Sequence, residues 1–175
     1  SLSPIVLWID EIEKAMAAGS GSGEADAGLS RRLFGAFLTW LQEKKQEVFV
    51  VATANNLSLL PPELLRKGRF DEIFFVDLPD DSERESIWKI HLGLRKQNVK
   101  QFDLLKIVSA SDGFSGSEIE QAVVAALYRA LHQKTPLTTG LLIEELTNTM
   151  PLSVTRREDI DQLRETAQGR FVNVR

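Results

Sequence analysis

The sequence predicts an α/β fold with a parallel sheet in its first half, followed by an all-helical second half. Two observations lead to this prediction. Short apolar runs at Ile5–Ile9 and Val48–Thr53 end directly in polar side chains, which is typical of parallel strands that are buried on both faces. From Ser82 onward strand signals vanish and apolar residues recur at helical spacing. A boundary near Pro79 therefore divides the chain into parts 1–79 and 80–175.

The composition narrows the possible functions. The chain has 175 residues, 43% of them apolar, so it can bury the core of one ordinary domain or two small ones. Its net charge of −4 means that the chain lacks the overall positive charge that attracts nucleic acid or an anionic membrane. The absence of cysteine excludes disulfides, thiolate metal sites and thiol catalysis. Because no apolar run approaches the roughly 18 to 20 residues that span a bilayer, we expect a soluble intracellular protein with neither a membrane nor a nucleic-acid partner.

The first apolar run delivers acidic side chains to its end. Ile5–Ile9 is followed at once by Asp10 and Glu11, and a buried strand tolerates charge only where it leaves the core. Open α/β sheets bind ligands beyond the carboxyl ends of their strands, where a divalent cation and water can reach carboxylates. A catalytic metal site is one interpretation. The other is a core strand that runs into the acidic first turn of a helix.

The segment between the two strands is predicted to contain two helices with a loop between them. Ile12–Ala18 can form a short helix, which the glycine and serine residues of Gly19–Gly28 interrupt. That loop is either a plain linker or a functional segment kept flexible. The second helix has Ser30 as a candidate cap, and its apolar face consists of Leu33, Phe34, Phe37, Leu38 and Leu41.

Polar residues also follow the second strand. Asn55 lies just beyond Val48–Thr53, where its amide could orient a water or a phosphate oxygen, although asparagine also commonly starts a turn. Farther along, Arg66 and Arg69 flank a glycine. Guanidinium groups suit phosphate recognition because they stay ionised and donate two hydrogen bonds at once. A third strand is predicted at 73–76.

The second half is predicted to consist of helices alone. The first opens with a capping pattern of Ser82 and Glu85, and its apolar face carries Ile87, Trp88, Ile90 and Leu94. The strongest helix follows a turn at Gly113–Gly116, and its buried stripe is expected to contain Ile119, Val123, Val124, Leu127 and Leu131. The other helices are expected at 102–109, 138–148 and 156–168, and the tail 169–175 is expected to fray.

Four motifs follow one another in an order that one family shares. They are Val6–Glu11, Ala52–Asn56, Leu64–Asp71 and Gly113–Ile119. In this order they resemble the AAA+ ATPases of the classical AAA clade, and more narrowly the AAA proteins of cyanobacteria and algal plastids. The resemblance covers essentially the whole chain. It implies the carboxyl-terminal part of a P-loop NTPase parallel sheet followed by an all-helical AAA+ lid, in a protein of the cytoplasm or the plastid stroma.

The resemblance implies hydrolysis of ATP with Mg²⁺. By this resemblance Asp10 holds the magnesium shell, Glu11 polarises the attacking water and Asn55 is the sensor-1 residue that positions that water. Arg66 and Arg69 match the arginine fingers, which act on the nucleotide of the neighbouring subunit in a self-assembled ring, expected to be a hexamer. By the same resemblance, hydrolysis would remodel a protein substrate.

The helical half would contribute nucleotide contacts as well. Gly116 and Ser117 match the lid turn that approaches the adenine and ribose, and His91 matches a lid histidine that contacts the nucleoside. A histidine on the shoulder of a helix is the structural alternative for His91. The loop Gly19–Gly28 occupies the place of a second pore loop. A non-catalytic AAA-fold module for interaction and assembly is the alternative function.

One motif of the family does not occur in these 175 residues. The phosphate-binding pattern G-x-x-x-x-G-K-[ST] is missing, and the chain enters a core strand without an initiator methionine, so we expect sequence upstream. We also expect residues 1–175 alone neither to bind ATP tightly nor to hydrolyse it. Without the strand of that motif, the sheet is expected to close by pairing 48–53 with 73–76, by strand exchange between chains, or by disorder in the first half.

Overall fold

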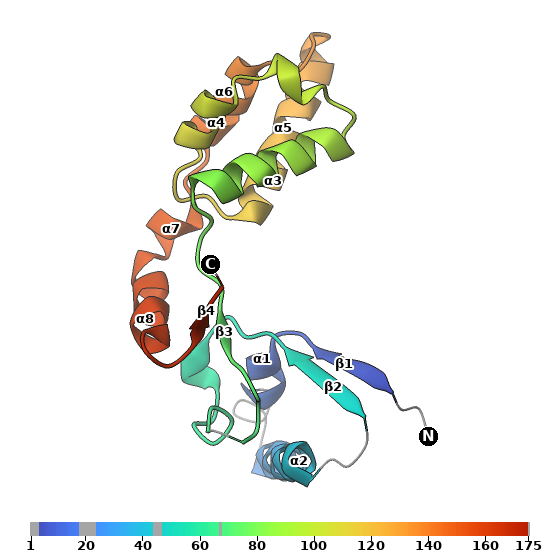
Figure 1. The fold of residues 1–175 in the computed structure, drawn as a ribbon, viewed down its shortest axis with the longest axis vertical. Coiled ribbons are helices and arrows are strands. Elements are labelled where there is room, and N and C mark those ends of the chain that lie inside the picture. The colour runs from blue at the N-terminus through green and yellow to red at the C-terminus, as the bar shows by residue number, and fades with distance from the viewer. Residues whose placement is uncertain (1–3, 18–23, 44–46, 67, 175) are drawn as a thin grey trace. The chain divides into compact units, whose positions relative to one another are not determined.

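The computed structural model describes residues 4–17, 24–43, 47–66 and 68–174, and it divides the chain into two compact units (Figure 1). The first unit contains residues 1–75 together with 169–173, and the second contains residues 76–168 together with 174–175. A separate hydrophobic core stabilises each unit, because the buried side chains form two distinct clusters.

The first unit is built on a pair of parallel strands. β1 (Ile5–Ile9) pairs with β2 (Val48–Ala52) over its whole length, so that Ile9 lies opposite Ala52. The α/β fold class with parallel strands is therefore confirmed. Because parallel strands end on the same side, the residues that follow Ile9 and Ala52 emerge at one edge of the pair.

A second strand pair brings the end of the chain into the first unit. β3 (Phe74–Phe75) pairs in parallel with β4 (Val172–Asn173), and the Val172 amide donates a 2.9 Å hydrogen bond to the Ile73 carbonyl. The expectation that the tail frays is therefore wrong, because its residues 172–173 form a strand. Of the three expected ways to close the sheet, direct pairing of β2 with β3 is wrong within the described residues, where β3 pairs with β4. A strand of two residues is too short to show alternation, which is why the sequence did not indicate it.

Helices cover one face of the β1–β2 pair. α1 (Ile12–Ala17) follows β1, and α2 (Glu24–Glu43) begins earlier than the expected cap at Ser30. Residues 19–23 of the predicted glycine-rich loop lie outside the described residues, and its remaining residues 24–28 belong to α2, so the loop prediction is wrong for that part. The short 3-10 helix η1 (Leu57–Leu59) follows β2. The core of this unit consists of Ile12, Leu38, Leu41, Leu60 and Leu64, with Ile9, Val50 and Ala52 packed against them.

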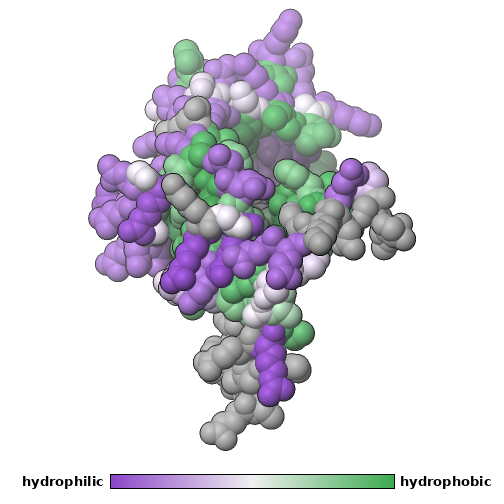
Figure 2. All heavy atoms as spheres, turned by 60° about the horizontal axis from the view of Figure 1, so that its bottom comes forward, coloured by the Kyte–Doolittle hydropathy of each residue, from purple (hydrophilic) through white to green (hydrophobic). Residues whose placement is uncertain are grey.

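The other face of the β1–β2 pair is exposed within the described residues. Val6, Trp8 and Phe49 lie on that face and are 67%, 62% and 68% exposed, because successive side chains of a strand point to opposite sides. The expectation that both faces are buried is therefore wrong for this chain. Hydrophobic surface between hydrophilic side chains is also visible on the face of the molecule that Figure 2 shows.

The second unit contains helices and no strand between residues 76 and 168. The elements are α3 (Asp81–Leu94), η2 (Val99–Gln101), α4 (Leu104–Ala110), α5 (Gly116–Gln133), α6 (Thr139–Asn148), α7 (Leu152–Thr155) and α8 (Arg157–Ala167). Its core is centred on side chains with no exposed surface: Trp88, Leu92, Ile107, Ile119 and Leu142. None of the helices in the described parts of the chain has the length and apolar character needed to cross a membrane.

The start of α3 shows two local signals in competition. The cap is Asp80, whose side chain accepts from the Glu83 amide while the Glu83 side chain accepts from the Asp80 amide. The expected cap, Ser82 with Glu85, has the same spacing but lies within the helix. Both pairs match the capping-box pattern, so the sequence alone does not choose between them.

The buried stripes of α3 and α5 also differ from those expected. Within α3, Ile90 is 57% exposed and Leu94 is 70% exposed, whereas Leu92 is buried. In α5, Leu131 is 72% exposed, and the core positions are filled by Ile119, Ala122, Val123, Ala126 and Ala130. Small side chains allow close packing between helices, so the largest residues of a helix need not mark its buried face.

Candidate functional site

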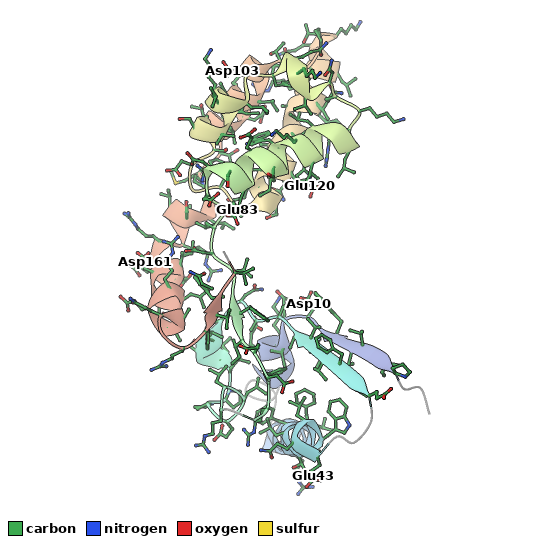
Figure 3. All side chains as sticks on the ribbon, in the orientation of Figure 1. Asp10, Glu43, Glu83, Asp103, Glu120 and Asp161 are labelled. Carbon is green, nitrogen blue, oxygen red and sulfur yellow. The ribbon has the colours of Figure 1, made fainter. Side chains whose placement is uncertain are left out.

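The residues that follow β1 and β2 come together at one end of the parallel pair. Beyond Ile9 and Ala52 the two segments stay linked, because the Thr53 amide donates to the Ile9 carbonyl and the Ile12 amide donates to the Thr53 carbonyl, both at 2.9 Å. Asp10 lies at this end of β1 (Figure 3). The structure therefore places the polar residues of both strand ends in one small region.

Side-chain hydrogen bonds connect the predicted acids to the second strand. The Asn55 side-chain amide donates to the Glu11 carboxylate at 3.0 Å. The Thr53 hydroxyl accepts from the Glu11 backbone amide at 3.0 Å and donates to Asp10 Oδ1 at 2.5 Å. The predicted residues Asp10, Glu11 and Asn55 are thus held in one network, which we call the strand-end network. Thr53, which the sequence analysis did not single out, lies at its centre.

A buried carboxylate holds the backbone of the strand-end network. Glu13 is 2% exposed, and its Oε1 accepts a 2.9 Å hydrogen bond from the Asn55 backbone amide. Its Oε2 is buried and has no hydrogen-bond partner among the described residues. Leaving a buried oxygen unsatisfied costs free energy. No sequence pattern marks Glu13 as buried, because an acidic residue in the first turn of a helix is usually solvated and is stabilised there by the helix dipole.

Glu11 adopts a backbone conformation that is uncommon outside glycine. Its φ angle is +49°, in the left-handed region. One carboxylate oxygen accepts from Asn55, and the other forms a 2.5 Å ion pair with Lys14 Nζ. The hydrogen bond to Glu11 raises the pKa of Lys14. Because this ion pair is exposed, it adds little to folding stability, and its effect is to restrict where the Glu11 carboxylate lies.

The two predicted arginines lie on a different loop of the first unit. Arg66 is exposed, whereas Arg69 is half-buried and its guanidinium donates to the Glu63 carbonyl. Between them Gly68 has a φ angle of +90°, which a side chain would disfavour. Within the described residues no side-chain hydrogen bond or ion pair joins either guanidinium to Glu11 or the rest of the strand-end network.

The predicted lid histidine belongs to the second unit. His91 Nδ1 lies 3.7 Å from Glu120 Oε1 and 3.3 Å from Arg95 Nη1. Arg95 donates to the same Glu120 oxygen at 2.7 Å, and this bond lowers the pKa of Glu120. Contacts to Arg95, which caps α3, and to Glu120 of α5 therefore hold His91 on the shoulder of a helix, as its structural alternative expects. The side chain keeps 18% of its surface exposed, so part of the ring is accessible.

Gly116 and Ser117 form the first turn of α5. Ser115 caps this helix in a capping box with Glu118. A Cβ atom added at Gly116 would meet Ile87 Cδ1 at 3.6 Å, an ordinary contact, so packing within this unit does not require a glycine. Ser117 is exposed, with its hydroxyl 3.2 Å from that of Ser115. The first turn of α5 therefore carries no large side chain at these two positions.

The strand-end network fits a magnesium ion that arrives together with phosphate. Within the described ranges no group of three or more His, Cys, Asp or Glu side chains could hold a metal ion. Mg²⁺ commonly takes one or two carboxylates from the protein, and water and phosphate oxygens fill its other positions. The exposed carboxylate of Asp10, oriented by the Thr53 hydroxyl, meets this requirement.

Comparison with known proteins assigns the family. Residues 1–78 match the family described as "ATPase family associated with various cellular activities (AAA)", and residues 101–141 match the AAA+ lid domain. The chain therefore belongs to the AAA family. The two matches occur in the order that the sequence motifs predict, with the α/β part first and the helical lid second.

Two relatives are similar to nearly the whole chain. The chain is 45% identical over 170 residues to "Uncharacterized AAA domain-containing protein ycf46" of Guillardia theta, and 46% identical over 174 residues to the protein of the same name in Pyropia yezoensis. The alignments cover 97% and 98% of this chain but only 33% and 35% of those proteins. The resemblance to this group of AAA proteins is confirmed, and the chain spans about a third of the length of these relatives.

A solved structure agrees with the fold. The crystal structure of the FIGL-1 AAA domain matches 95% of this chain and 57% of that chain, with a TM-score of 0.73. Only 16% of the aligned residues are identical. At this identity the comparison supports the fold alone, which is a partial AAA α/β unit followed by a helical lid.

Proposed function

We propose that this chain supplies part of the active site of an ATPase, which hydrolyses ATP with Mg²⁺ in an oligomeric ring and thereby remodels a protein substrate. The observation that carries the proposal is the strand-end network, in which Asp10, Glu11 and Asn55 meet at the carboxyl ends of two parallel strands. Membership of the AAA family supports it. The cytoplasm, or the plastid stroma, is the proposed location.

Each residue of the network has a proposed role. When bound, Mg²⁺ would neutralise charge on the phosphate oxygens, and Asp10 is the carboxylate that would hold its shell. Glu11 would accept the proton of the attacking water, because its carboxylate is anchored but partly accessible. The Asn55 amide, which bonds to Glu11, would orient the same water without adding charge.

Residues outside the network are proposed to act on a nucleotide in two ways. The exposed Arg66, together with Arg69, would stabilise transition-state charge on the nucleotide of a neighbouring subunit. In the second unit, the accessible edge of His91 would contact the nucleoside. The small first turn of α5, at Gly116 and Ser117, would let a ligand approach the backbone closely.

The test is ATP turnover by the longest natural chain that contains these residues. We expect Glu11→Gln to lower kcat by at least about 100-fold while nucleotide binding is retained, because the change removes a general base but keeps the shape. Glu43→Gln is the matched control, since Glu43 is an exposed residue at the end of α2. Residues 1–175 alone are expected to show neither tight ATP binding nor turnover, and measurable turnover would contradict that expectation.

The contrary outcome supports the interaction-module function instead. If the long chain assembles into an oligomer and its wild-type form shows no ATP turnover, the strand-end network is not an active site. Equal turnover by wild type and Glu11→Gln would likewise remove Glu11 from the mechanism, because a general base is then not needed at that position.

A further inference from the structure

Thr53 directs all of its polar groups toward the last residue of β1 and the segment that follows it. Its backbone amide and carbonyl bond to Ile9 and Ile12, both at 2.9 Å. Its hydroxyl accepts from the Glu11 amide at 3.0 Å and donates to Asp10 Oδ1 at 2.5 Å. A threonine hydroxyl carries one proton, so accepting from an amide and donating to a carboxylate is the arrangement that satisfies both bonds.

These bonds account for the backbone conformation of Glu11. A non-glycine residue with a φ angle of +49° occupies a sparsely populated region, which persists only where the surroundings determine it. The Thr53 hydroxyl is the acceptor for the Glu11 amide in that conformation, and Asn55 binds the Glu11 side chain. One residue therefore fixes the Glu11 backbone while another fixes its carboxylate.

We propose that Thr53 is a positioning residue of the ATPase site: its hydroxyl holds Glu11 in the left-handed conformation and orients the Asp10 carboxylate. This inference rests on the proposed function. Thr53 does not need to touch nucleotide, since it acts through the two acids. Without its hydroxyl, the Glu11 amide loses its acceptor and Asp10 loses its donor, so the Glu11 backbone and the Asp10 carboxylate become free to move away from the productive arrangement.

Two substitutions separate the hydroxyl from the rest of the side chain. Thr53→Val has nearly the same shape but lacks the hydroxyl, whereas Thr53→Ser keeps the hydroxyl and loses only a methyl group. Thr39→Val is the matched control because the Thr39 hydroxyl also donates a 3.0 Å bond, in this case to the Gly35 carbonyl on the exposed surface of α2. All three variants are made in the longest natural chain that contains these residues.

The first measurement is ATP turnover together with nucleotide affinity. We expect Thr53→Val to lower kcat by about 10- to 100-fold, because small displacements of catalytic groups have effects of this size. Its nucleotide dissociation constant should stay within about threefold of the wild-type value, since the network is proposed to act on the attacking water and the metal ion rather than on the base of the nucleotide. Thr53→Ser and Thr39→Val should both turn over like wild type. Wild-type turnover by Thr53→Val, or an equal loss in Thr53→Ser, overturns the inference.

The second measurement does not depend on turnover. Hydrogen exchange of the Glu11 amide should become faster by about tenfold or more in Thr53→Val and stay unchanged in Thr53→Ser and Thr39→Val. If the wild-type chain proves unable to hydrolyse ATP, the proposed function fails, and this exchange rate still decides whether Thr53 positions Glu11. An unchanged Glu11 exchange rate in Thr53→Val overturns the inference whatever the turnover.

Discussion

Asn55 connects the two strand ends through its side chain, so its replacement by aspartate is informative. The Asn55 amide donates to Glu11 Oε1 at 3.0 Å. In Asn55→Asp a carboxylate oxygen would face another carboxylate at that distance, which replaces a hydrogen bond by repulsion. We expect ATP turnover of the long chain to fall on the order of 100-fold, as it does when one aligned donor is removed from an active site.

The neighbouring asparagine provides the control for this prediction. Asn56 Oδ1 accepts from the Ser58 amide at 2.9 Å and caps η1. Aspartate at this position keeps the acceptor, so Asn56→Asp adds the same charge without breaking a bond. We expect its turnover to match wild type. If both variants lose turnover equally, the added negative charge is responsible for the loss. The prediction that the Asn55 hydrogen bond to Glu11 supports turnover is then contradicted.

Two exposed carboxylates of the second unit predict how its stability depends on pH. The hydrogen bond from Arg95 lowers the pKa of Glu120 below its ordinary value of 4.5, and that from Lys106 lowers the pKa of Asp103 below 3.8. A carboxyl group whose pKa is lower in the folded state than in the unfolded state stabilises the folded state at pH values above the unfolded pKa. This contribution is lost as the pH falls through the folded pKa.

The pH prediction is tested by a double variant, Glu120→Gln with Asp103→Asn. The wild-type second unit should be slightly more stable than the double variant at pH 7, and the difference should vanish as pH falls below the lowered pKa values. The effect is small because both groups are exposed and screened by solvent. Denaturant unfolding at pH 7 and pH 3 measures it. A difference that grows toward pH 3 would have the wrong sign.

At the scale of residues, the sequence predicted polar side chains that are unusual where they occur and missed those of a type that is common there. Asp10, Glu11 and Asn55 were predicted because charge and amide groups at the end of apolar runs are unusual. Threonine is a common strand residue, so Thr53 drew no attention. Its bond to Asp10 joins positions 43 residues apart, and its partner is determined by the register of two strands, which no local pattern reveals.

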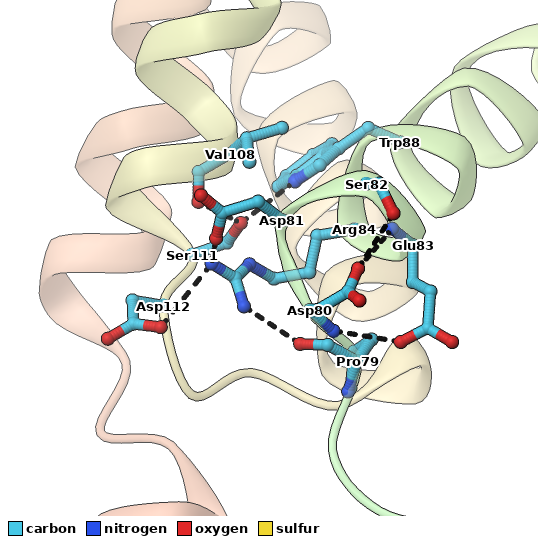
Figure 4. A network of polar contacts seen from close by, with 10 residues as sticks. All are labelled: Pro79, Asp80, Asp81, Ser82, Glu83, Arg84, Trp88, Val108, Ser111 and Asp112. Carbon is cyan, nitrogen blue, oxygen red and sulfur yellow. Dashed lines mark hydrogen bonds and ion pairs between the residues drawn. The ribbon is translucent and has the colours of Figure 1, made fainter. Parts of the chain in front are cut away.

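At the scale of elements, a buried arginine ties the start of α3 to the rest of the second unit (Figure 4). Arg84 is 4% exposed, and its guanidinium donates to the Pro79 carbonyl at 2.8 Å. The same group lies 2.5 Å from Asp81 and 3.3 Å from Asp112, whose side chains are each 87% exposed. Removing the guanidinium therefore leaves both carboxylates in water and takes the donor from the part-buried Pro79 carbonyl.

Arg84→Met tests this network because methionine keeps the apolar stem but lacks the guanidinium. We expect the unit to lose about 1.5 to 3 kcal/mol, the contribution of a hydrogen bond to a charged group, rather than the larger loss seen when a buried charge is left unpaired. Native-state hydrogen exchange of the α3 amides measures the opening free energy. Lys89→Met on the same helix is the control, since its ion pair with Glu85 is exposed. Equal losses in the two variants would contradict the prediction.

The elements that the sequence predicted have either an apolar run that ends in polar residues or apolar residues at helical spacing. β1, β2 and the major helices of the second unit were expected, and the structure contains them. β4 was missed because its two residues gain their structure from pairing with β3 and not from their own pattern. The exposed face of β1 and β2 was also missed, since an apolar run does not tell which of its faces this chain covers.

At the scale of the whole molecule, the proposed site is divided between the strand-end network and the loop that carries Arg66. Within the described residues no side-chain bond joins the two. An arginine that acts on the nucleotide of a neighbouring subunit explains this separation. In the proposed ring, each active site takes Glu11 from one subunit and Arg66 from its neighbour. A ring that mixes a Glu11 variant with an Arg66 variant should therefore contain some sites in which both residues are intact.

Mixing two inactive variants of the long chain tests this arrangement. The Glu11→Gln subunit keeps its arginines, and the Arg66→Gln subunit keeps its acids. A mixed ring therefore contains interfaces at which intact acids face an intact arginine. The ATP turnover of the mixture should be well above the sum of the turnovers of the two separate proteins. Glu11→Gln mixed with Asn55→Asp is the control. Both of those defects lie in the strand-end network of a single subunit, so no interface is repaired. If native mass spectrometry shows mixed rings and the first mixture stays inactive, Arg66 does not act between subunits.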